Sequence, residues 1–178
     1  MENKQQFEPA LVMYRSTLLD LPSVELPTGY TLRSFLSGDE ASWEAIINQS
    51  FQYESNFQQE IASKEYYKPE RVLFICYEGI PVATAIAWYQ PVWNEHTGYL
   101  HMVGALPSHT GKGLGFQVCL AALHEMSNEG RMTTVLNTDD FRLPAIKTYL
   151  KLGYKPLLIH ENQGKRWEDI LNNNNFHI

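Results

Sequence analysis

A glycine-rich segment is the part of this sequence whose residue spacing most directly suggests chemistry. Gly111, Gly113 and Gly115 alternate between an apolar segment, residues 99–106, and a helix-like segment, residues 113–128. Glycine can take a positive φ, and without a Cβ it lets another molecule approach the backbone closely. A helix that begins near Gly113 would direct its unpaired N–H groups and the positive end of its dipole to the same place. This combination is typical of a phosphate site.

Other motifs that bind phosphates or perform catalysis do not fit the spacing. Phe116 stands where the dinucleotide fingerprint needs a third Gly or Ala, and the Lys112–Gly113 pair lacks the Ser or Thr of a P-loop. His124 and the glutamate after it begin a zinc-protease pattern, but Asn128 occupies the second ligand position. The Gly-x-Ser-x-Gly pattern of the α/β-hydrolases does not occur. The loop therefore indicates a phosphate site of another class.

Composition restricts the class of protein to which this loop can belong. The chain has 178 residues, 44% of them hydrophobic and 19% charged, which predicts one globular domain with a substantial core. The formal net charge of -6 argues against nucleic acid or an anionic membrane as the main partner, because both would be repelled. Cys76 and Cys119 lie in apolar segments and are interpreted as reduced core thiols. The polar N-terminus and the lack of a long apolar segment predict a cytoplasmic protein.

The hydrophobic periodicity predicts an α/β fold. Strands are expected at residues 30–35, 72–77, 81–89, 99–106, 133–137 and 154–159, and helices at 39–51, 58–67, 113–128, 144–152 and 167–171. The segment Ser37 to Glu40 matches a capping box at the start of the first helix. Hairpin-linked strands that lead into strand–helix–strand crossovers favour a central mixed sheet flanked by helices.

One domain is expected over residues 30–171. Residues 1–29 are interpreted as a lead-in packed on that domain, with one possible strand at residues 11–14. Residues 172–178, which are rich in Asn, are interpreted as a tail that frays. No internal repeat is evident, so the loop and the sheet belong to one folding unit.

Two segments of the sequence resemble the GNAT superfamily, the GCN5-related N-acetyltransferases. In that family the loop reads Arg or Gln, two residues, Gly, one residue, then Gly or Ala, and residues 110–115 occupy these positions here. Residues 145–154 match the family's second recognisable segment, and the resemblance covers roughly residues 30–160. It implies the GNAT acyl-CoA N-acyltransferase fold, acetyl-CoA as co-substrate and no metal. A helical C-terminus is expected in place of the family's usual last strand.

The resemblance also implies which residues bind the donor. They are Val103, Gly104, Ala105, Thr110, Gly111, Lys112, Gly113, Leu114, Gly115, Phe116, Asn137 and Arg142. Backbone groups of the first three are expected to bind the pantetheine amides and to place an N–H at the thioester oxygen, with Gly104 supplying the distortion of a β-bulge. Thr110 departs from the family's Arg or Gln, and Arg142 stands where many members have Asn.

Tyr149 and His101 are the candidate catalytic residues. Tyr149 matches the family tyrosine that protonates the departing thiolate, and a phenol of pKa ~10 can donate to a thiolate of pKa ~8.5. His101 is a candidate base, because its side chain titrates near neutrality and strand alternation puts it on the same face as Val103 and Ala105. Other candidate bases are Glu54, Glu78 and Glu95. Deprotonation relayed by water would need none of these side chains.

The sequence therefore predicts an N-acetyltransferase that passes acetyl from acetyl-CoA to a primary amine of a small molecule or peptide by direct attack. The alternative is a non-catalytic acyl-CoA-binding or regulatory domain, which would keep the loop without depending on Tyr149. An aromatic acceptor pocket is a further hypothesis, drawn from Tyr53, Phe57, Tyr66, Tyr67, Trp88, Tyr89 and Trp93. A monomer or homodimer without nucleic-acid or membrane partners is expected.

Overall fold

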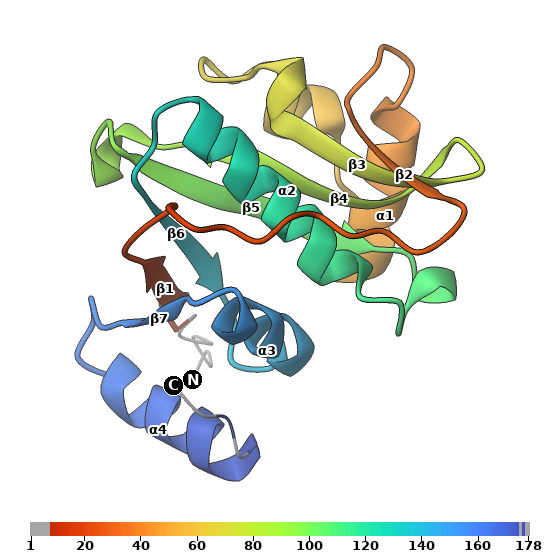
Figure 1. Ribbon diagram of the computed structural model, residues 1–178. Coiled ribbons are helices and arrows are strands. Elements are labelled where there is room, and N and C mark those ends of the chain that lie inside the picture. Colours follow the sequence, from red (N-terminus) through yellow and green to blue (C-terminus); the bar gives the residue numbers. More distant parts are fainter. Residues whose placement is uncertain (1–7, 175, 177–178) are drawn as a thin grey trace, which may run out of the picture.

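The computed structural model describes residues 8–174 and 176, and it shows a central sheet with helices on both faces (Figure 1). The sheet has seven strands in the order β2-β3-β4-β5-β6-β1-β7. The strands are β1 Leu11–Arg15, β2 Tyr30–Ser34, β3 Val72–Tyr77, β4 Ile80–Tyr89, β5 Thr97–Ala105, β6 Thr133–Thr138 and β7 Lys155–Leu157. Among the strands of the described residues, only β5 and β6 pair in parallel. The expected mixed α/β sheet is confirmed.

Helices cover this sheet from two sides. They are α1 Glu40–Phe51, α2 Leu114–Asn128, α3 Leu143–Lys151 and α4 Gln163–Asn174. Helix α2 packs on one face of β3, β4 and β5, and α1 packs on the opposite face of β4 and β5 (Figure 1). Short 3-10 turns occur at Pro69–Arg71, Pro91–Trp93 and Pro107–His109.

The sheet separates two apolar clusters, and α2 contributes to the larger one. Its side chains are apolar nearly all round, because the sheet lies on one side and the segment between β1 and β2 crosses the other (Figure 1). Leu18 of that crossing segment is buried, and Leu21 and Val24 pack against the same cluster. On the opposite face, α1 buries Trp43 and Ile46 against the sheet. The two clusters hold the sheet rigid between α1 and α2.

Strand β1 lies between β6 and β7 and pairs antiparallel with both. Leu11 and Met13 are fully buried in the α2-side cluster. The sequence predicts only a possible strand here, inside a lead-in, and no strand after residue 159. The structure completes this side of the sheet with the N-terminal strand, so the sheet begins well before residue 30.

Helix α4 follows β7, as expected, but it is longer than the sequence indicates. It runs to Asn174, three residues into the segment interpreted as a fraying tail. The Asn174 side-chain amide donates to the Ile170 carbonyl at 2.8 Å, and Trp167 and Ile170 are buried on the helix's inner face. The expectation for residues 175, 177 and 178 lies outside the described residues.

The sequence pattern before α1 predicts a cap that the structure does not have. The capping box is wrong, because Asp39 is the N-cap residue and no side chain caps the helix. The Asp39 carboxylate instead accepts hydrogen bonds from Arg33 and from the Leu36 N–H, at 2.6 and 2.7 Å. An ion pair to β2 thus takes the place of the expected cap.

Two further elements are shorter than expected. The helix expected at residues 58–67 is a π-helical turn over Gln58–Ala62. The strand expected at residues 154–159 is reduced to Lys155–Leu157, where Pro156 cannot donate to a neighbour. None of the helices in the described part of the chain combines the length and the apolarity needed to cross a bilayer.

Candidate active site

The parallel pair β5–β6 is paired at one end only, and this creates the candidate site. Pairing runs from Thr97 with Thr133 to Tyr99 with Val135, after which the strands diverge. Strand β5 continues to Ala105, so residues 100–105 have no neighbouring strand on that side. Those of their backbone N–H and C=O groups that face away from β4 form an open edge to which another molecule's amides can bind.

A β-bulge lies in β5 beside this open edge. Thr84 pairs with Gly104 but Ile86 pairs with His101, so β5 holds one extra residue between the two pairs. Met102 has a φ of 49° there, a left-handed conformation that costs a non-glycine residue about 1–2 kcal/mol. The expectation that Gly104 supplies the distortion is wrong, because Gly104 is regularly paired and the bulge centres on Met102.

Gly104 is needed for a different reason, the close approach of α1. A Cβ at this position would lie 2.7 Å from Ser50 Oγ and 3.1 Å from Ile46 Cγ2. Ser50 Oγ accepts a hydrogen bond from the Ala105 N–H at 3.1 Å and donates to the Ile46 carbonyl at 2.7 Å. Glycine therefore allows a helix side chain to bind the strand edge directly.

Strand alternation decides which backbone groups face the gap. The Leu106 N–H donates to the Val82 carbonyl of β4 at 2.8 Å. The backbone groups of Val103 and Ala105 therefore point the opposite way, into the gap between β5 and β6. Since Ser50 already binds the Ala105 N–H, the Val103 N–H is the donor of this pair that remains for a ligand.

The glycine loop has the predicted geometry. Gly111 and Gly113 have φ values of 76° and 74°, and Gly113 is the N-cap of α2. A residue with a Cβ would be strained at both positions. The Thr110 hydroxyl donates back to the Pro107 carbonyl at 2.9 Å, so it stabilises the loop. The first N–H groups of α2 face the loop as an anion site.

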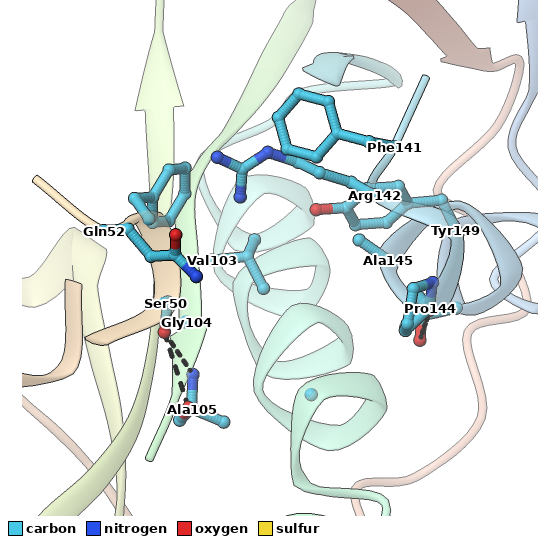
Figure 2. A pocket seen from close by; sticks show the side chains of 13 residues that line it. Ser50, Gln52, Val103, Gly104, Ala105, Phe141, Arg142, Pro144, Ala145 and Tyr149 are labelled. Carbon is cyan, nitrogen blue, oxygen red and sulfur yellow. Dashed lines mark hydrogen bonds between the residues drawn. The ribbon is translucent and has the colours of Figure 1, made fainter. Parts of the chain in front are cut away.

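Three cavities form one cleft around these elements. The cavity over the loop has a volume of about 610 Å³ and shares Ala105, Gly115 and Thr148 with a neighbour of about 690 Å³ (Figure 2). That second cavity shares Val103 and Tyr149 with a third of about 190 Å³ at the point where the strands diverge. The cleft thus runs from the anion site along β5 to the opposite face of the sheet.

Tyr149 lies at the junction of the second and third cavities. Figure 2 shows its hydroxyl directed from α3 into the cavity, toward Val103. The hydroxyl forms no hydrogen bond to any residue that the structure describes, although the side chain is 7% exposed. Burial raises the pKa of Tyr149 well above its usual value, so the phenol is fully protonated at neutral pH. It can act as a proton donor at this point of the cleft.

His101 lies in the third cavity, but not on the predicted face of β5. The bulge turns it toward Trp88 and Tyr99, with ring centroids 6.1 and 5.4 Å away, while Val103 and Ala105 pack on the α2 side. The expected shared face is therefore wrong, because the extra residue changes the alternation. Burial lowers the pKa of His101 to about 4. The imidazole is neutral at pH 7 and only weakly basic.

The remaining predicted donor residues fall in different parts of the cleft. Thr110, Gly111, Gly113, Leu114, Gly115 and Phe116 line the loop cavity. The Lys112 side chain is exposed and is not among the lining residues. Asn137 and Arg142 line the third cavity, away from the loop, and Arg142 also lines the second.

Several lining residues were not predicted from the sequence. They are Ser50, Phe51, Gln52, His109, Gln117, Phe141, Pro144, Ala145, Thr148 and Lys151. Ala145, Thr148 and Lys151 could have been found, because they lie within one helical turn of Tyr149. Ser50 and Phe51 at the end of α1, and Gln52 directly after it, meet β5 only through tertiary packing, for which the sequence holds no local signal.

The aromatic residues and acids proposed for an acceptor pocket lie mostly elsewhere. Phe57 is 1% exposed and stacks on Phe35 with ring centroids 4.8 Å apart, so it belongs to the core. None of the seven aromatics lines the three cavities of the cleft, nor do the acids Glu54, Glu78 and Glu95. Cys76 and Cys119 are buried free thiols, as predicted.

This fold and cleft define a class of protein, and comparison with known proteins shows which. The model of the acetyltransferase (GNAT) family matches residues 39–154, more than half of the chain. The chain therefore belongs to the GNAT acetyltransferase family.

Curated relatives are longer proteins. The chain is 28% identical over 144 residues to a mycothiol acetyltransferase of Streptomyces griseus, covering 76% of this chain and 46% of the relative. It is 29% identical over 147 residues to that of Pseudarthrobacter chlorophenolicus, with 76% and 45% covered. The chain thus spans about half the length of these relatives.

Solved structures share the fold. A GCN5-related N-acetyltransferase from Sphaerobacter thermophilus aligns with a TM-score of 0.65 at 22% identity, over 84% of this chain and 50% of that one. The ribosomal-protein-S18-alanine N-acetyltransferase of Escherichia coli aligns with a TM-score of 0.61 at 19% identity, over 75% and 82%.

Proposed function

We propose that this protein is an N-acetyltransferase that moves acetyl from acetyl-CoA to a primary amine of a small molecule or peptide. The observation that carries the proposal is the continuous cleft. It joins the Gly111–Gly115 loop to the Tyr149 hydroxyl along the open edge of β5. Family membership and relatives named acetyltransferases support the reaction type.

The donor is proposed to lie along the cleft with its pyrophosphate on the loop. The N–H groups at the start of α2 and the left-handed glycines form the anion site. The pantetheine arm then follows residues 103–105, where the Val103 carbonyl faces the gap and can accept a hydrogen bond from an amide N–H of the arm. The Val103 N–H would hold the thioester oxygen, and a donor of this kind contributes about 3 kcal/mol in the transition state.

The reaction would proceed by direct attack. The neutral amine attacks the thioester carbonyl and forms the C–N bond, and its nitrogen loses one proton to water. The C–S bond breaks, and the thiolate takes a proton from the Tyr149 hydroxyl. Burial raises the pKa of the Tyr149 phenol, and the same burial would disfavour a charged thiolate, so the departing sulfur is driven to take up a proton. Solvent then reprotonates Tyr149.

Water is the better candidate to deprotonate the incoming amine. The lowered pKa of His101 makes its imidazole a poor acceptor for an ammonium proton. His101 lines the cavity where the amine would enter, and its side chain there is polar and uncharged. The buried free thiols suit a reducing compartment, which supports the expected cytoplasmic location.

A thiol-release assay tests the proposal. The purified protein is incubated with acetyl-CoA and, separately, amino acids, short peptides, polyamines, aminoglycosides and simple amines. Amine-dependent release of free CoA, with the N-acetyl product detected by mass spectrometry, is the expected result. Calorimetric binding of CoA without turnover of any amine would favour the non-catalytic alternative.

A further inference from the structure

Arg142 differs from every other arginine of the chain in how its guanidinium is used. Its Nε donates to the Asp139 carboxylate at 2.9 Å, and its two Nη groups form no hydrogen bond to any described residue. The five other arginines each donate from at least one Nη group. They are Arg15, Arg33, Arg71, Arg131 and Arg166.

The unused Nη groups are in a restricted position rather than on an open surface. The Arg142 side chain is 22% exposed, and one guanidinium face lies 4.0 Å from the centroid of the Phe51 ring. Arg142 lines the cavity, so a ligand there that accepts from the Nη groups gains charge-assisted hydrogen bonds. Phe51 covers one face of the guanidinium, and the Asp139 carboxylate accepts the hydrogen bond of its Nε. The edge that carries the Nη groups is left to a ligand.

The guanidinium and the catalytic tyrosine share one cavity. Arg142 begins α3, and Figure 2 shows its side chain reaching across the cavity toward Gln52, above the Tyr149 hydroxyl. Arg142 also lines the cavity on the opposite side of Tyr149, together with His101 and Asn137. It does not line the loop cavity. The anion that it can bind is therefore separate from the pyrophosphate proposed for the loop.

We propose that the Arg142 Nη edge binds a carboxylate of the acceptor, so that the acceptor is an amine carrying a carboxylate, such as an amino acid or short peptide. The inference rests on the proposed acetyltransferase function and names the substrate class for the same cleft. A planar guanidinium edge binds a carboxylate through two parallel N–H···O bonds. Asp139 fixes the guanidinium from its Nε side, and Phe51 fixes the plane in which the carboxylate must lie. The carboxylate thereby orients the amine toward the thioester.

Matched acceptor pairs test this inference. Initial rates of CoA release are measured for glycine, β-alanine, L-alanine and glycylglycine, each against its carboxamide. The wild-type protein is expected to prefer at least one acid over its amide by at least about tenfold in kcat/KM, the range of a charge-assisted pair. The amine of an amide is less basic, so more of it is neutral. A preference for the acid therefore cannot come from basicity.

Two variants separate recognition from charge and from folding. Arg142→Gln is expected to lower kcat/KM for the preferred acid at least about tenfold while changing that of its amide little, so that the preference disappears. Lys147→Gln removes a positive charge from the exposed face of the same helix and should retain the preference. The affinity for CoA, measured by calorimetry, should be unchanged in both variants.

Each remaining outcome has a definite meaning. Equal rates for acid and amide, or an equal loss for both in Arg142→Gln, would overturn the inference and leave Arg142 a structural residue. Turnover of spermidine or another amine without a carboxylate, with none of the acids, would also overturn it while the proposed function stands. If no amine at all is acetylated, the proposed function fails first, and the inference fails with it.

Discussion

In the proposed reaction, Tyr149 is the residue on which the chemistry depends most. Its side chain is buried, its hydroxyl is directed into the cleft, and its raised pKa keeps it protonated at neutral pH. Tyr149→Phe removes only that proton donor. We expect kcat for amine-dependent CoA release to fall at least about tenfold with little change in CoA affinity, because general acid catalysis contributes about 10²- to 10⁴-fold. Unchanged turnover in the variant would show that the thiolate takes its proton elsewhere.

His101 should make the stability of the protein depend on pH. Burial holds its pKa at about 4, compared with about 6.5 in an unfolded chain. Only the unfolded state therefore binds a proton as the pH falls below about 6.5. The contribution of His101 to stability is complete above that pH and is lost toward pH 4, by about 3 kcal/mol.

Urea unfolding at pH 7 and pH 4.5 measures this effect. The wild-type protein should lose about 2 to 3 kcal/mol more between these pH values than His101→Gln, which has no group to titrate there. Parallel losses in the two proteins would mean that the imidazole is solvated or paired in the folded state. In that case His101 would regain its place as a candidate base.

Gly104 offers a test of the contact between α1 and β5. Gly104→Ala places a Cβ 2.7 Å from Ser50 Oγ, which must break its bond to the Ala105 N–H or move α1. We expect a loss of about 1–3 kcal/mol in the free energy of unfolding. Gly115→Ala is the matched control, because nothing lies within 4 Å of its Cβ and alanine favours a helix. A tolerated Gly104→Ala would mean that α1 can withdraw from the strand.

At the scale of elements, β1 is the part of the fold least evident from the sequence. Met13 of β1 is fully buried between β6 and β7, so Met13→Ala should destabilise the protein by about 2–5 kcal/mol in urea unfolding. Leu19→Ala, at a side chain that is 74% exposed, should change stability by less than about 0.5 kcal/mol. Equal, small effects would show that β1 is not required for the sheet.

The elements that the sequence predicts well are those whose signals are local. The loop and α2 follow from alternating glycines before an apolar helix, and the hairpin β3–β4 turns at Glu78 and Gly79, which both have positive φ. The bulge at Met102 has no such signal, because a methionine in a left-handed conformation is imposed by the neighbouring strands. One extra residue there moved His101 to the other face of the sheet.

The sequence predicts the loop residues and Tyr149 that line the cleft, but not Ser50 or Phe51. The loop and Tyr149 lie in two segments that resemble a known family, whereas Ser50, Phe51 and Arg142 meet only after folding. The Nε of Arg142 bonds to Asp139, while its Nη groups form no hydrogen bond to a described residue. Pairing partners of this kind depend on tertiary distances, which a single sequence does not contain.

At the scale of the whole molecule, one sheet that opens between two parallel strands accounts for the loop, the open edge of β5 and the position of Tyr149. The two apolar clusters pack on opposite faces of the sheet, and the cleft lies where β5 and β6 diverge between them. A donor entering from the α2 side and an acceptor entering from the α1 side would meet at Tyr149. We propose that acetyl passes directly from the donor to the acceptor.

Mass spectrometry of the products and of the intact protein in one reaction tests this claim most directly. The protein is first incubated with acetyl-CoA alone, and then with the amine that gives the fastest CoA release. We predict no acetylated protein in the first stage and one N-acetylated amine for each CoA released in the second. An acetylated protein that disappears when the amine is added, or CoA release without an N-acetyl product, would contradict direct transfer in this cleft.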